Sequence, residues 1–418
     1  MPEPLFDLEP PRPPARLRFD VDDPRLAAAA WSRLAEPGDV VAGALVAHLG
    51  ATGALAWLVD AQADPVRALR GENLERLAGG VQRETLRRLA DAVGRWSQRL
   101  ASLDPRRELR VLDRYGGTLL TPGDPRWPVA LADLGAAAPF ALWVRGDPDL
   151  SAWSPRSVAL VGARAATSYG ERVAEDLATG LVDRGFAVVS GGAYGIDAAA
   201  HRGAIAGGGT TCAVLAGGVD RFYPQGNDAL LRRVVDTGGA VVSEVPPGSA
   251  PFRQRFLSRN RLIAAATGAT VVVEAARRSG ALSTARRAVD LLRPVGAVPG
   301  PVTSMASAGC HGLLRDGAAV CVGDASEVAE LAGALGADMA QHRPAESAAR
   351  VDDPRAGLGP DELLVLDALP ARAAATVDSL ARTAGLPPRR VVAVLGGLER
   401  LRLARRDGAR WRGAARPR

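Results

Sequence analysis

The sequence predicts an α/β protein built around a Rossmann-like, doubly wound parallel sheet. Between residues 156 and 325, short apolar segments rich in β-branched residues alternate with stretches of helical length. Strands buried on both faces have this continuous apolar character, and strand–helix alternation indicates a parallel sheet covered by helices. Glycine and polar residues follow the ends of six apolar segments. Parallel sheets bind their ligands beyond these carboxyl ends, so we expect a site there.

The expected strands can be placed from the apolar segments themselves. In chain order they are Ser157–Val161, Phe186–Ser190, Thr211–Leu215, Ala240–Ser243, Thr270–Glu274 and Gly296–Val298, with a seventh near Ala319–Val322. The segments between them, such as Gly170–Arg184 and Thr284–Leu292, have the length and apolar spacing of helices.

The 418 residues allow about two or three domains. Residues 26–103 carry apolar side chains at helical spacing and predict a small helical module of the SAM-like or helix-hairpin-helix type. We expect residues 104–330 to form the extended Rossmann-like domain. The sequence of its first part, residues 104–153, predicts strands and turns. Residues 331–359 lack periodicity and predict a linker. In residues 360–418, three helical patterns precede a hairpin at Asp407-Gly408, which indicates a winged helix.

Composition narrows the classes of function. The three cysteines show no CxxC spacing, and the four histidines do not cluster with them, so we expect no metal site and no disulfide framework. The acidic, proline-rich start does not resemble a signal peptide. We also expect no apolar run approaching the ~18 residues of a membrane span. These observations predict a cytoplasmic protein that needs no cofactor.

The chain contains no lysine, and all 52 Lys+Arg residues are arginines. A Walker A loop and Schiff-base chemistry both require lysine, so both are excluded. A GxGxxG fingerprint for dinucleotides is also missing. Arginine nevertheless binds phosphate in a bidentate manner, and the net charge of +6 permits a polyanionic partner.

The residues that follow the strands favour an anionic or nucleotide-like ligand. Arg164, after the first expected strand, could hold a phosphate, and Thr167 could cap the next helix. The Arg259-Asn260-Arg261 motif has two interpretations, phosphate binding or loop fixation by salt bridges, and both stay open. His201 follows Asp197 by one helical turn, which favours a structural pair over acid–base chemistry. The possible carboxylate sites lack a metal-binding set or a nucleophile.

Seven ordered motifs resemble the DprA/Smf family of DNA-processing proteins. They are VALVGARAATSYG (158–170), VSGGAYGIDAAAHRGA (189–204), AVLAGGVDRFYPQGN (213–227), SEVPPG (243–248), FLSRNRLIA (256–264), VVVEAARRSGALSTA (271–285) and AVPG (297–300). The resemblance extends over about residues 105–320, and the flanking modules resemble those of the family.

The resemblance implies a binding protein rather than an enzyme. Members of the family bind single-stranded DNA in a basic pocket, load the RecA recombinase onto it during natural transformation, and form homodimers through the Rossmann-like domain. Arg164 matches the pocket arginine of the family. The implied DNA-binding set is Arg164, Thr167, Ser190, Gly191, Gly192, Arg221, Asn227, Arg259, Asn260, Arg261, Ser279, Gly280 and Thr284.

The chain departs from the family pattern at three places. Gln225 stands where many members carry a basic residue, and Arg221 could compensate for the lost charge. Leu257 replaces a proline, and Gly309-Cys310-His311 replaces a Gly-x-Asn sequence.

Two other classes of function remain as alternatives. The sheet is similar to that of lysine-decarboxylase-like phosphoribohydrolases, but the loop from Ser190 to Gly195 lacks the proline and threonine of their Pro-Gly-Gly-x-Gly-Thr sequence. The winged helix alone would suit a transcription regulator, whose recognition helix would begin near Arg389-Arg390.

Overall fold

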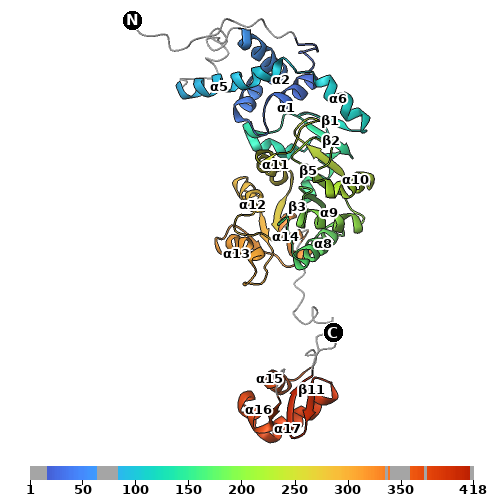
Figure 1. Ribbon diagram of the computed structural model, residues 1–418, viewed down its shortest axis with the longest axis vertical. Helices are drawn as coiled ribbons and strands as arrows, with labels where there is room; N and C mark the ends of the chain where they lie inside the picture. The colour runs from blue at the N-terminus through green and yellow to red at the C-terminus, as the bar shows by residue number, and fades with distance from the viewer. Residues whose placement is uncertain (1–16, 64–82, 335–337, 339–357, 371–373, 415–418) are drawn as a thin grey trace. The chain divides into compact units, whose positions relative to one another are not determined.

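The structure is a computed structural model that describes residues 17–63, 83–334, 338, 358–370 and 374–414 (Figure 1). The chain divides into two compact units, Met1–Ala340 and Gln341–Arg418. The first unit contains the large sheet and the N-terminal helices. The second is a small helical unit with its own sheet.

The first unit is organised around one nine-stranded sheet with the order β1-β2-β6-β5-β4-β3-β7-β8-β9. Strands β3 to β9 run parallel, whereas β1 and β2 are antiparallel additions beside β6. The strands are β1 Thr118–Leu120, β2 Leu142–Gly146, β3 Ser157–Val161, β4 Ala187–Ser190, β5 Thr211–Leu215, β6 Ala240–Ser243, β7 Ala269–Val272, β8 Val295–Ala297 and β9 Val320–Cys321.

This strand order confirms the predicted doubly wound, Rossmann-like sheet. From β3 in the middle, the chain passes outward through β4, β5 and β6, then crosses over to β7, β8 and β9 on the other side. The predicted strands β3, β5 and β6 agree with the structure residue for residue. The prediction for β4 differs by one residue at its start, and those for β8 and β9 differ by one residue at each end. The prediction for β7 runs too far, because Val273 and Glu274 already lie beyond the ladder.

Helices cover both faces of the sheet. On β3, Val158 and Leu160 pack with α8 and α9, whereas Ala159 and Val161 pack in the cluster that contains α11 and α12. This alternation is the period of two that a strand requires. The helices of this part are α7 Leu150–Trp153, α8 Ser168–Val182, α9 Ile196–Ala206, α10 Asp228–Asp236, α11 Arg253–Ala266, α12 Ala281–Asp290, α13 Ala308–Arg315 and α14 Ala325–Ala332.

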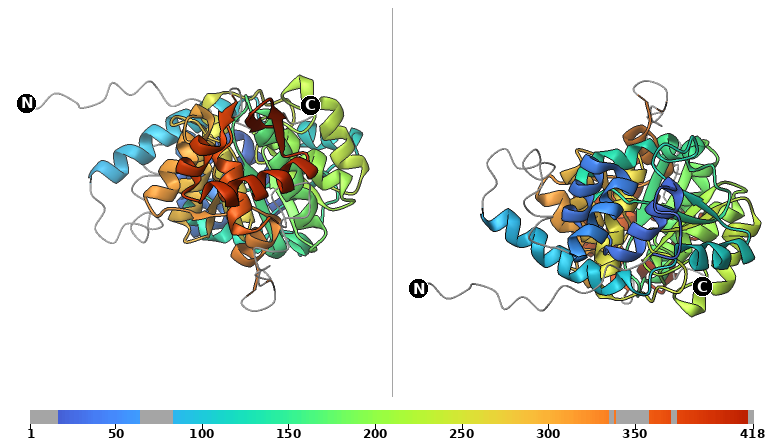
Figure 2. Two further views of the ribbon diagram at one scale, coloured as in Figure 1. Left: turned by 90° about the horizontal axis from the view of Figure 1, so that it is seen from below. Right: turned by 90° about the horizontal axis from the view of Figure 1, so that it is seen from above.

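The N-terminal helices share a separate apolar core. The helices in this core are α1 Pro24–Leu34, α2 Val40–Ala63 and α5 Arg83–Leu100, and α5 extends away from the others (Figure 2). Helix α6 Pro105–Arg114 instead packs Leu112 into a cluster with residues of the sheet. The rings of Trp31 and Trp96 meet edge to face with centres 5.3 Å apart. The indole Nε1 of Trp143 on β2 donates to the hydroxyl of Ser32 at 3.2 Å, which ties these helices to the sheet.

Two features of this region differ from the sequence prediction. Helix α6 stands where strands and turns were expected; Asp104 caps it and Pro105 occupies its first position. Residues Val40–Gln62 are long and apolar enough to cross a membrane by length and composition, which corrects the expectation that no such run exists. Gly50, with φ of 71°, interrupts this helix, and Leu55 and Leu58 are buried in the core that contains Trp31.

The second unit contains three helices and a three-stranded antiparallel sheet. Its elements are α15 Pro360–Ala368, β10 Ala375–Thr376, α16 Val377–Ala384, α17 Pro388–Arg400, β11 Ala404–Asp407 and β12 Arg410–Gly413, and the strand order is β10-β12-β11. Val365, Leu380, Leu395 and Trp411 lie in one core. The three helices and the hairpin agree with the prediction, which did not include β10.

Only part of the predicted linker, residues 331–359, lies among the described residues. Helix α14 extends through Ala332, so residues 331–332 are helical. Residues 335–337 and 339–357 lie outside the described residues, as do residues 1–16.

Candidate nucleic-acid interface

An open hollow of about 920 Å³ lies beyond the carboxyl ends of β3 and β7, where the direction of winding reverses. Most of its lining comes from three segments that are distant in sequence, at residues 161–165, 251–263 and 276–284. This is the place where open α/β sheets bind their ligands. The fold therefore places a hollow at the strand ends where the sequence predicts a ligand site.

Arginines dominate the charge of this hollow. Arg164, Arg253 and Arg278 line it with exposed side chains, and Arg259 lies buried at its base. Asp197 is the one acidic residue among the lining residues that the structure describes. The hollow is therefore electropositive, which favours an anionic ligand.

Arg164 has the geometry of a residue that is free to bind such a ligand. Its guanidinium carbon lies 4.8 Å from the centre of the Phe256 ring, a cation–π contact. Within the described part of the chain, no ion pair or hydrogen bond of its side chain is recorded. The carboxylates that could have held it, Glu244 and Glu274, are bound by Arg261 and Thr167 instead.

The loop that carries Arg164 is fixed through its backbone. The Ala163 N–H donates to the carbonyl of Glu274 at 2.7 Å, and the Ala163 carbonyl accepts from the N–H of Ile196 at 3.2 Å. A Cβ at Gly162 would lie 2.5 Å from the Ile196 side chain, so only glycine permits this close approach. Arg164 is thus presented from a rigid backbone.

Arg259 supports the base of the hollow. Its Nη1 donates to the carbonyl of Gly191 at 2.8 Å and to the carbonyl of Val214. Burial lowers the pKa of Arg259 to about 10, and the negative charge of Asp197 opposes this change. A Cβ at Gly191 would lie 2.4 Å from the guanidinium, so glycine makes room for it. The structure thus brings Arg259 and Gly191 together as parts of the floor.

Arg261 forms a buried ion pair, on the same helix but away from the hollow. Its guanidinium donates to both oxygens of Glu244 at 2.5 and 2.8 Å. Both side chains are almost completely inaccessible to water. Of the two interpretations left open for the Arg259-Asn260-Arg261 motif, the geometry of Arg261 agrees with loop fixation.

The other predicted residues divide into two groups. Asn260, Ser279, Gly280 and Thr284 line the hollow. Thr167, Ser190, Gly192 and Asn227 do not line it, and three of them use their polar atoms internally. The Thr167 hydroxyl donates to Glu274 at 2.6 Å, the Ser190 hydroxyl donates to Leu160 at 2.7 Å, and the Asn227 amide donates to Gly192 at 3.0 Å.

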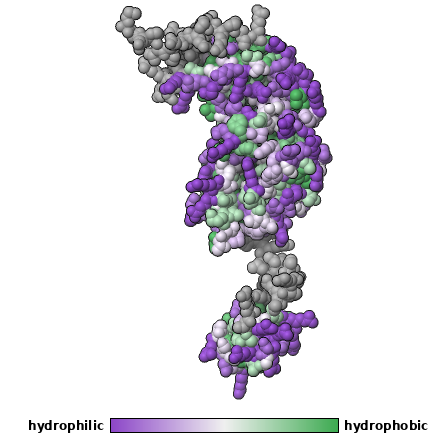
Figure 3. All heavy atoms as spheres, viewed as in Figure 1, coloured by the Kyte–Doolittle hydropathy of each residue, from purple (hydrophilic) through white to green (hydrophobic). Residues whose placement is uncertain are grey.

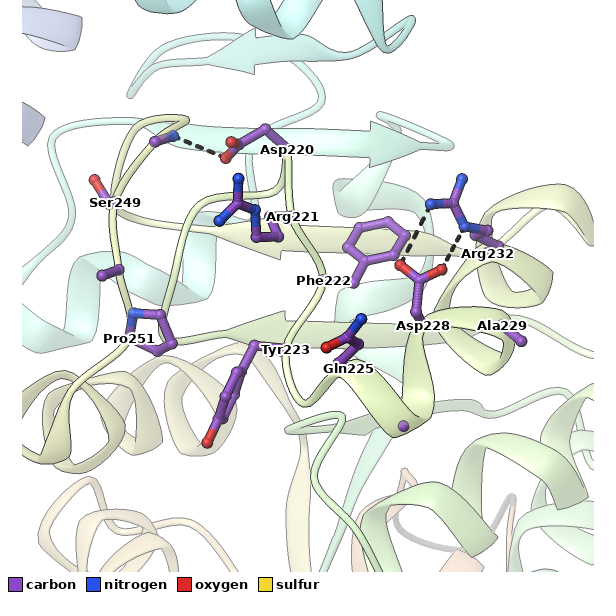
Figure 4. Close-up of a pocket in the computed structure, with 13 residues that line it drawn as sticks. Asp220, Arg221, Phe222, Tyr223, Gln225, Asp228, Ala229, Arg232, Ser249 and Pro251 are labelled. Atoms are coloured by element: carbon purple, nitrogen blue, oxygen red, sulfur yellow. Dashed lines mark hydrogen bonds and ion pairs between the residues drawn. The ribbon is translucent and has the colours of Figure 1, made fainter.

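A second hollow of about 900 Å³ adjoins the first, and Tyr223 and Pro251 line both. Arg221 lines this second hollow rather than the one with Arg164, together with Gln225 (Figure 4). Arg232, across the same hollow, is engaged by Asp228 at 2.7 Å. Arg221 and Gln225 therefore line the same hollow, and compensation of the lost charge by Arg221 stays a prediction.

The loop that carries Arg221 and Tyr223 rests on Arg145 of β2. The Arg145 guanidinium lies between the rings of Tyr115 and Phe222, 4.7 and 4.4 Å from their centres. It also donates to the carbonyl of Val219 at 3.0 Å. Sequence reasoning missed Arg145, because its segment lies outside the expected strand ends.

Sequence reasoning also missed four residues that line the first hollow. Arg253, Arg278, Phe252 and Tyr223 all line it, and all four are exposed. Arg278 and Tyr223 stand in the motifs that carry the family resemblance, in the loops that follow β7 and β5, so their position was a usable signal. Arg253 and Phe252 depend on where α11 begins, which the sequence left undefined.

The potential acid–base residues are held in structural roles. The Thr211 hydroxyl donates to the Val188 carbonyl, so His201 must carry its proton on Nδ1 to donate to Thr211 at 2.8 Å. Burial lowers the pKa of His201 to about 4. Burial also raises the pKa of Asp197, which accepts from the N–H groups of Gly191 and Ala193. Among the described residues, no group of three or more His, Cys, Asp and Glu could hold a metal ion.

The fold and the hollow define a Rossmann-like protein that presents arginines and aromatic rings to an anionic ligand at its switch point. Comparison with known proteins gives the particular family. The family model of DNA recombination-mediator protein A matches residues 118–333, and the chain belongs to this family.

The relative from Mycobacterium tuberculosis and the structure from Streptococcus pneumoniae support this assignment. A DNA processing protein of the DprA type from Mycobacterium tuberculosis is 49% identical over 320 residues, which cover 73% of this chain and 79% of that protein. The structure of DNA processing protein A from Streptococcus pneumoniae aligns with a TM-score of 0.51 and 33% identity, over 61% of this chain and 89% of that chain. A structure from Helicobacter pylori, described for its single-stranded DNA binding mode, aligns with a TM-score of 0.46 and 28% identity, over 51% of this chain and 93% of that chain.

Proposed function

We propose that this protein binds single-stranded DNA in the hollow lined by Arg164, Arg253 and Arg278. The observation that carries the proposal is the combination of three exposed arginines with exposed aromatic rings around one open hollow. Proteins that bind single strands combine a positively charged path for the backbone with aromatic side chains on which bases stack. Membership of the recombination-mediator family supports the same ligand.

The aromatic residues favour a single strand over a duplex. Phe252 and Tyr223 are exposed at the edge of the hollow, and the Tyr223 ring lies 5.9 Å from that of Phe256. Bases of an intact duplex are stacked on each other and offer no face to such rings. Because Tyr223 lines both hollows, a strand bound beside Arg164 can continue towards Arg221.

We assign different roles to the residues of the predicted DNA-binding set. Arg164, Asn260, Ser279, Gly280 and Thr284 would contact the strand in the first hollow, and Arg221 would contact it in the second. The remaining residues shape the site from behind. These are Thr167, Ser190, Gly191, Gly192, Asn227, Arg259 and Arg261.

The proposed activity is binding in the cytoplasm, without chemical turnover. Glu244 and Glu274 are occupied by Arg261 and Thr167, and His201 is a neutral core residue. The partners we propose are those the family resemblance implies, namely single-stranded DNA, the RecA recombinase that the protein loads onto it, and a second copy of the chain.

The proposed dimer contact lies on the sheet domain between residues 289 and 320. Large apolar side chains are unusually exposed between residues 289 and 320, with Leu292 at 94%, Val302 at 89% and Met305 at 71%. Exposed apolar groups of this size favour association. Light scattering on residues 105–330 should report a dimer at micromolar concentration, and a monomer throughout that range would contradict the assignment.

We also propose the domain boundaries 26–103, 104–330, 331–359 and 360–418, and we interpret the last segment as a winged helix. Its order of helix, strand, two helices and hairpin supports that interpretation. On this division, a protein ending near Leu335 should fold and keep its affinity for single strands. Loss of binding by a well-folded protein of that length would move the site to residues 360–418.

The experiment that tests the function is a gel shift with the full chain. It compares one labelled single strand with its duplex, each with and without RecA. We expect preferential binding of the single strand and faster formation of RecA filaments on it. Equal affinity for both DNA forms, or no effect on RecA, would contradict the corresponding part of the proposal.

A further inference from the structure

A basic surface outside the sheet domain lies on the hairpin of β11 and β12. Residues 400–412 contain six arginines and a single acidic residue, Asp407. Apart from Trp411 and Ala404, which are buried, the hairpin is largely exposed. Hydrophilic side chains project from several sides of this unit (Figure 3).

The register of the hairpin places three arginines on one face. Arg405 stands directly opposite Arg412, and Asp407 stands directly opposite Arg410. Because side chains alternate along a strand, these four residues share the outer face. The inner face carries Ala404 and Trp411, which pack into the core.

The opposed pair Arg405–Arg412 is unfavourable in the isolated protein, because like charges directly across a ladder repel each other. In the described part of this unit, no carboxylate lies within ion-pair distance of Arg405, Arg410 or Arg412. The repulsion between these arginines lowers the stability of the free protein. Binding of a polyanion would neutralise their charge, which explains why the arginines stand together.

Helix α17 is the other candidate surface, and its start is less suited to anions. Arg390 donates to Asp361 at 2.6 Å, so part of its charge is already compensated. Pro387 and Pro388 occupy the cap and the first position of the helix. Proline has no N–H, so this helix start lacks backbone donors that an anion would need.

We propose that the C-terminal unit binds the phosphodiester backbone of DNA through the outer face of the β11–β12 hairpin, with Arg405, Arg410 and Arg412 as the contacts. This site is separate from the hollow in the sheet domain and does not depend on the function proposed for it. Two-stranded ribbons have dimensions that fit along a DNA groove. Guanidinium groups hold phosphates with paired hydrogen bonds.

The test uses the full chain with Arg405→Gln and Arg412→Gln combined, in the Arg164→Ala background so that the sheet hollow contributes less. Binding of a labelled duplex and of one of its strands is measured over a range of salt concentrations. For the duplex we expect a loss of about tenfold in affinity, the size of one charge-assisted hydrogen bond. The slope of log affinity against log salt should become shallower by nearly two units, about 0.9 for each phosphate contact.

The matched control removes the same charge from α17, as Arg389→Gln with Arg390→Gln. It should leave affinity and salt slope nearly unchanged. The melting temperature of the hairpin variant should be equal to or above that of the parent, because the repulsion between Arg405 and Arg412 has been removed. If the melting temperature of the hairpin variant is below that of the parent, the single variant Arg410→Gln is used instead. The slope of its log affinity against log salt should change by about one unit.

The outcomes separate the sources of the phosphates. A loss for the duplex alone identifies duplex DNA, and a loss for the strand alone identifies single-stranded DNA; either supports the hairpin site. An unchanged salt slope on both ligands overturns it. So does a larger loss in the α17 control, which would identify that helix as the DNA contact.

Discussion

The floor and the rim of the hollow use the same residue type for opposite purposes. Arg259 at the floor and Arg261, on the same helix but away from the hollow, are buried, and they donate to backbone carbonyls and to Glu244. Arg164 and Arg278 are exposed at the rim of the same hollow, with no ion pair recorded for them in the described part of the chain. All four are always charged at neutral pH, so their surroundings decide what they do.

The difference shows why the basic residues of such a site cannot be treated as equivalent. Removing a buried, paired arginine leaves a carboxylate or a carbonyl without its partner, which costs stability. Removing an exposed arginine changes the stability of the fold little, but it lowers the affinity for a phosphate ligand. Stability and affinity should therefore respond separately to substitutions of the buried and of the exposed arginines, and the following predictions test this separation.

The largest expected effect is on the buried ion pair. Arg261→Ala leaves Glu244 buried and unpaired, and should lower the free energy of unfolding by about 3–5 kcal/mol in urea denaturation. Replacing both partners by leucine should recover most of this loss, because no buried charge remains. As a control, Arg278→Ala at the rim should change stability by less than about 0.5 kcal/mol. Equal losses in the single and double variants would contradict the ion-pair interpretation.

The second prediction uses His201 to report on the buried interior. Burial and, to a lesser extent, the positive charge of Arg259 together lower its pKa to about 4. Below pH 6.5 the unfolded chain therefore binds a proton that the folded protein does not. The free energy of unfolding should fall as pH decreases from 6.5 towards 4, by about 3 kcal/mol in total from this group.

His201→Gln isolates that contribution. Unfolding by urea is measured at several pH values between 7 and 4.5 for both proteins, and the variant should show the shallower pH dependence. Parallel curves would mean that His201 takes up its proton equally in both states.

The third prediction concerns the rim. Arg164→Ala should weaken binding of single strands of any sequence by about 1.5–3 kcal/mol, the size of a charged hydrogen bond. The salt slope should decrease by about 0.7. Arg164→Lys should recover only part of the affinity, because an ammonium group lacks the guanidinium fork. The melting temperature should stay nearly constant; full affinity in the folded alanine variant would remove Arg164 from the site.

The smallest expected effect lies at the contact between the N-terminal helices and α11. Glu36 accepts hydrogen bonds from Arg255 and Arg99. Burial raises the pKa of Glu36, but the two arginines outweigh it and lower the pKa overall. The contacts of Glu36 with Arg255 and Arg99 stabilise the fold at neutral pH. This contribution is lost as the pH falls through the lowered pKa of Glu36.

Because Glu36 is partly exposed, Glu36→Gln should cost less than about 1 kcal/mol at low salt, and less still at high salt. Urea denaturation at two salt concentrations measures it. A loss of several kcal/mol in Glu36→Gln would contradict this prediction, because it would mean that Glu36 contributes as much as the buried pair of Arg261 and Glu244.

The sequence predicted the sheet well because its strands are buried on both faces, and the apolar segments of β3, β5 and β6 therefore end where the strands end. It also located the hollow, since strand ends and their order suffice for that. It could not separate the floor from the rim. Arg253, Arg259 and Arg261 all stand within one arginine-rich helix, and only the packing of α11 against the sheet determines which are buried. Helix α6 was missed although Asp104-Pro105 is a recognisable helix start.

Strand β9 has a consequence for how two copies could meet. It is the outermost strand of its edge, yet it spans only Val320 and Cys321. So short an edge offers few free backbone groups as a template for another strand, which is one way proteins prevent open-ended sheet growth. Two copies joined here would be held by side chains such as Val302 and Met305 rather than by a continuous sheet. The contact would then be closed and reversible, and it would not propagate into fibres.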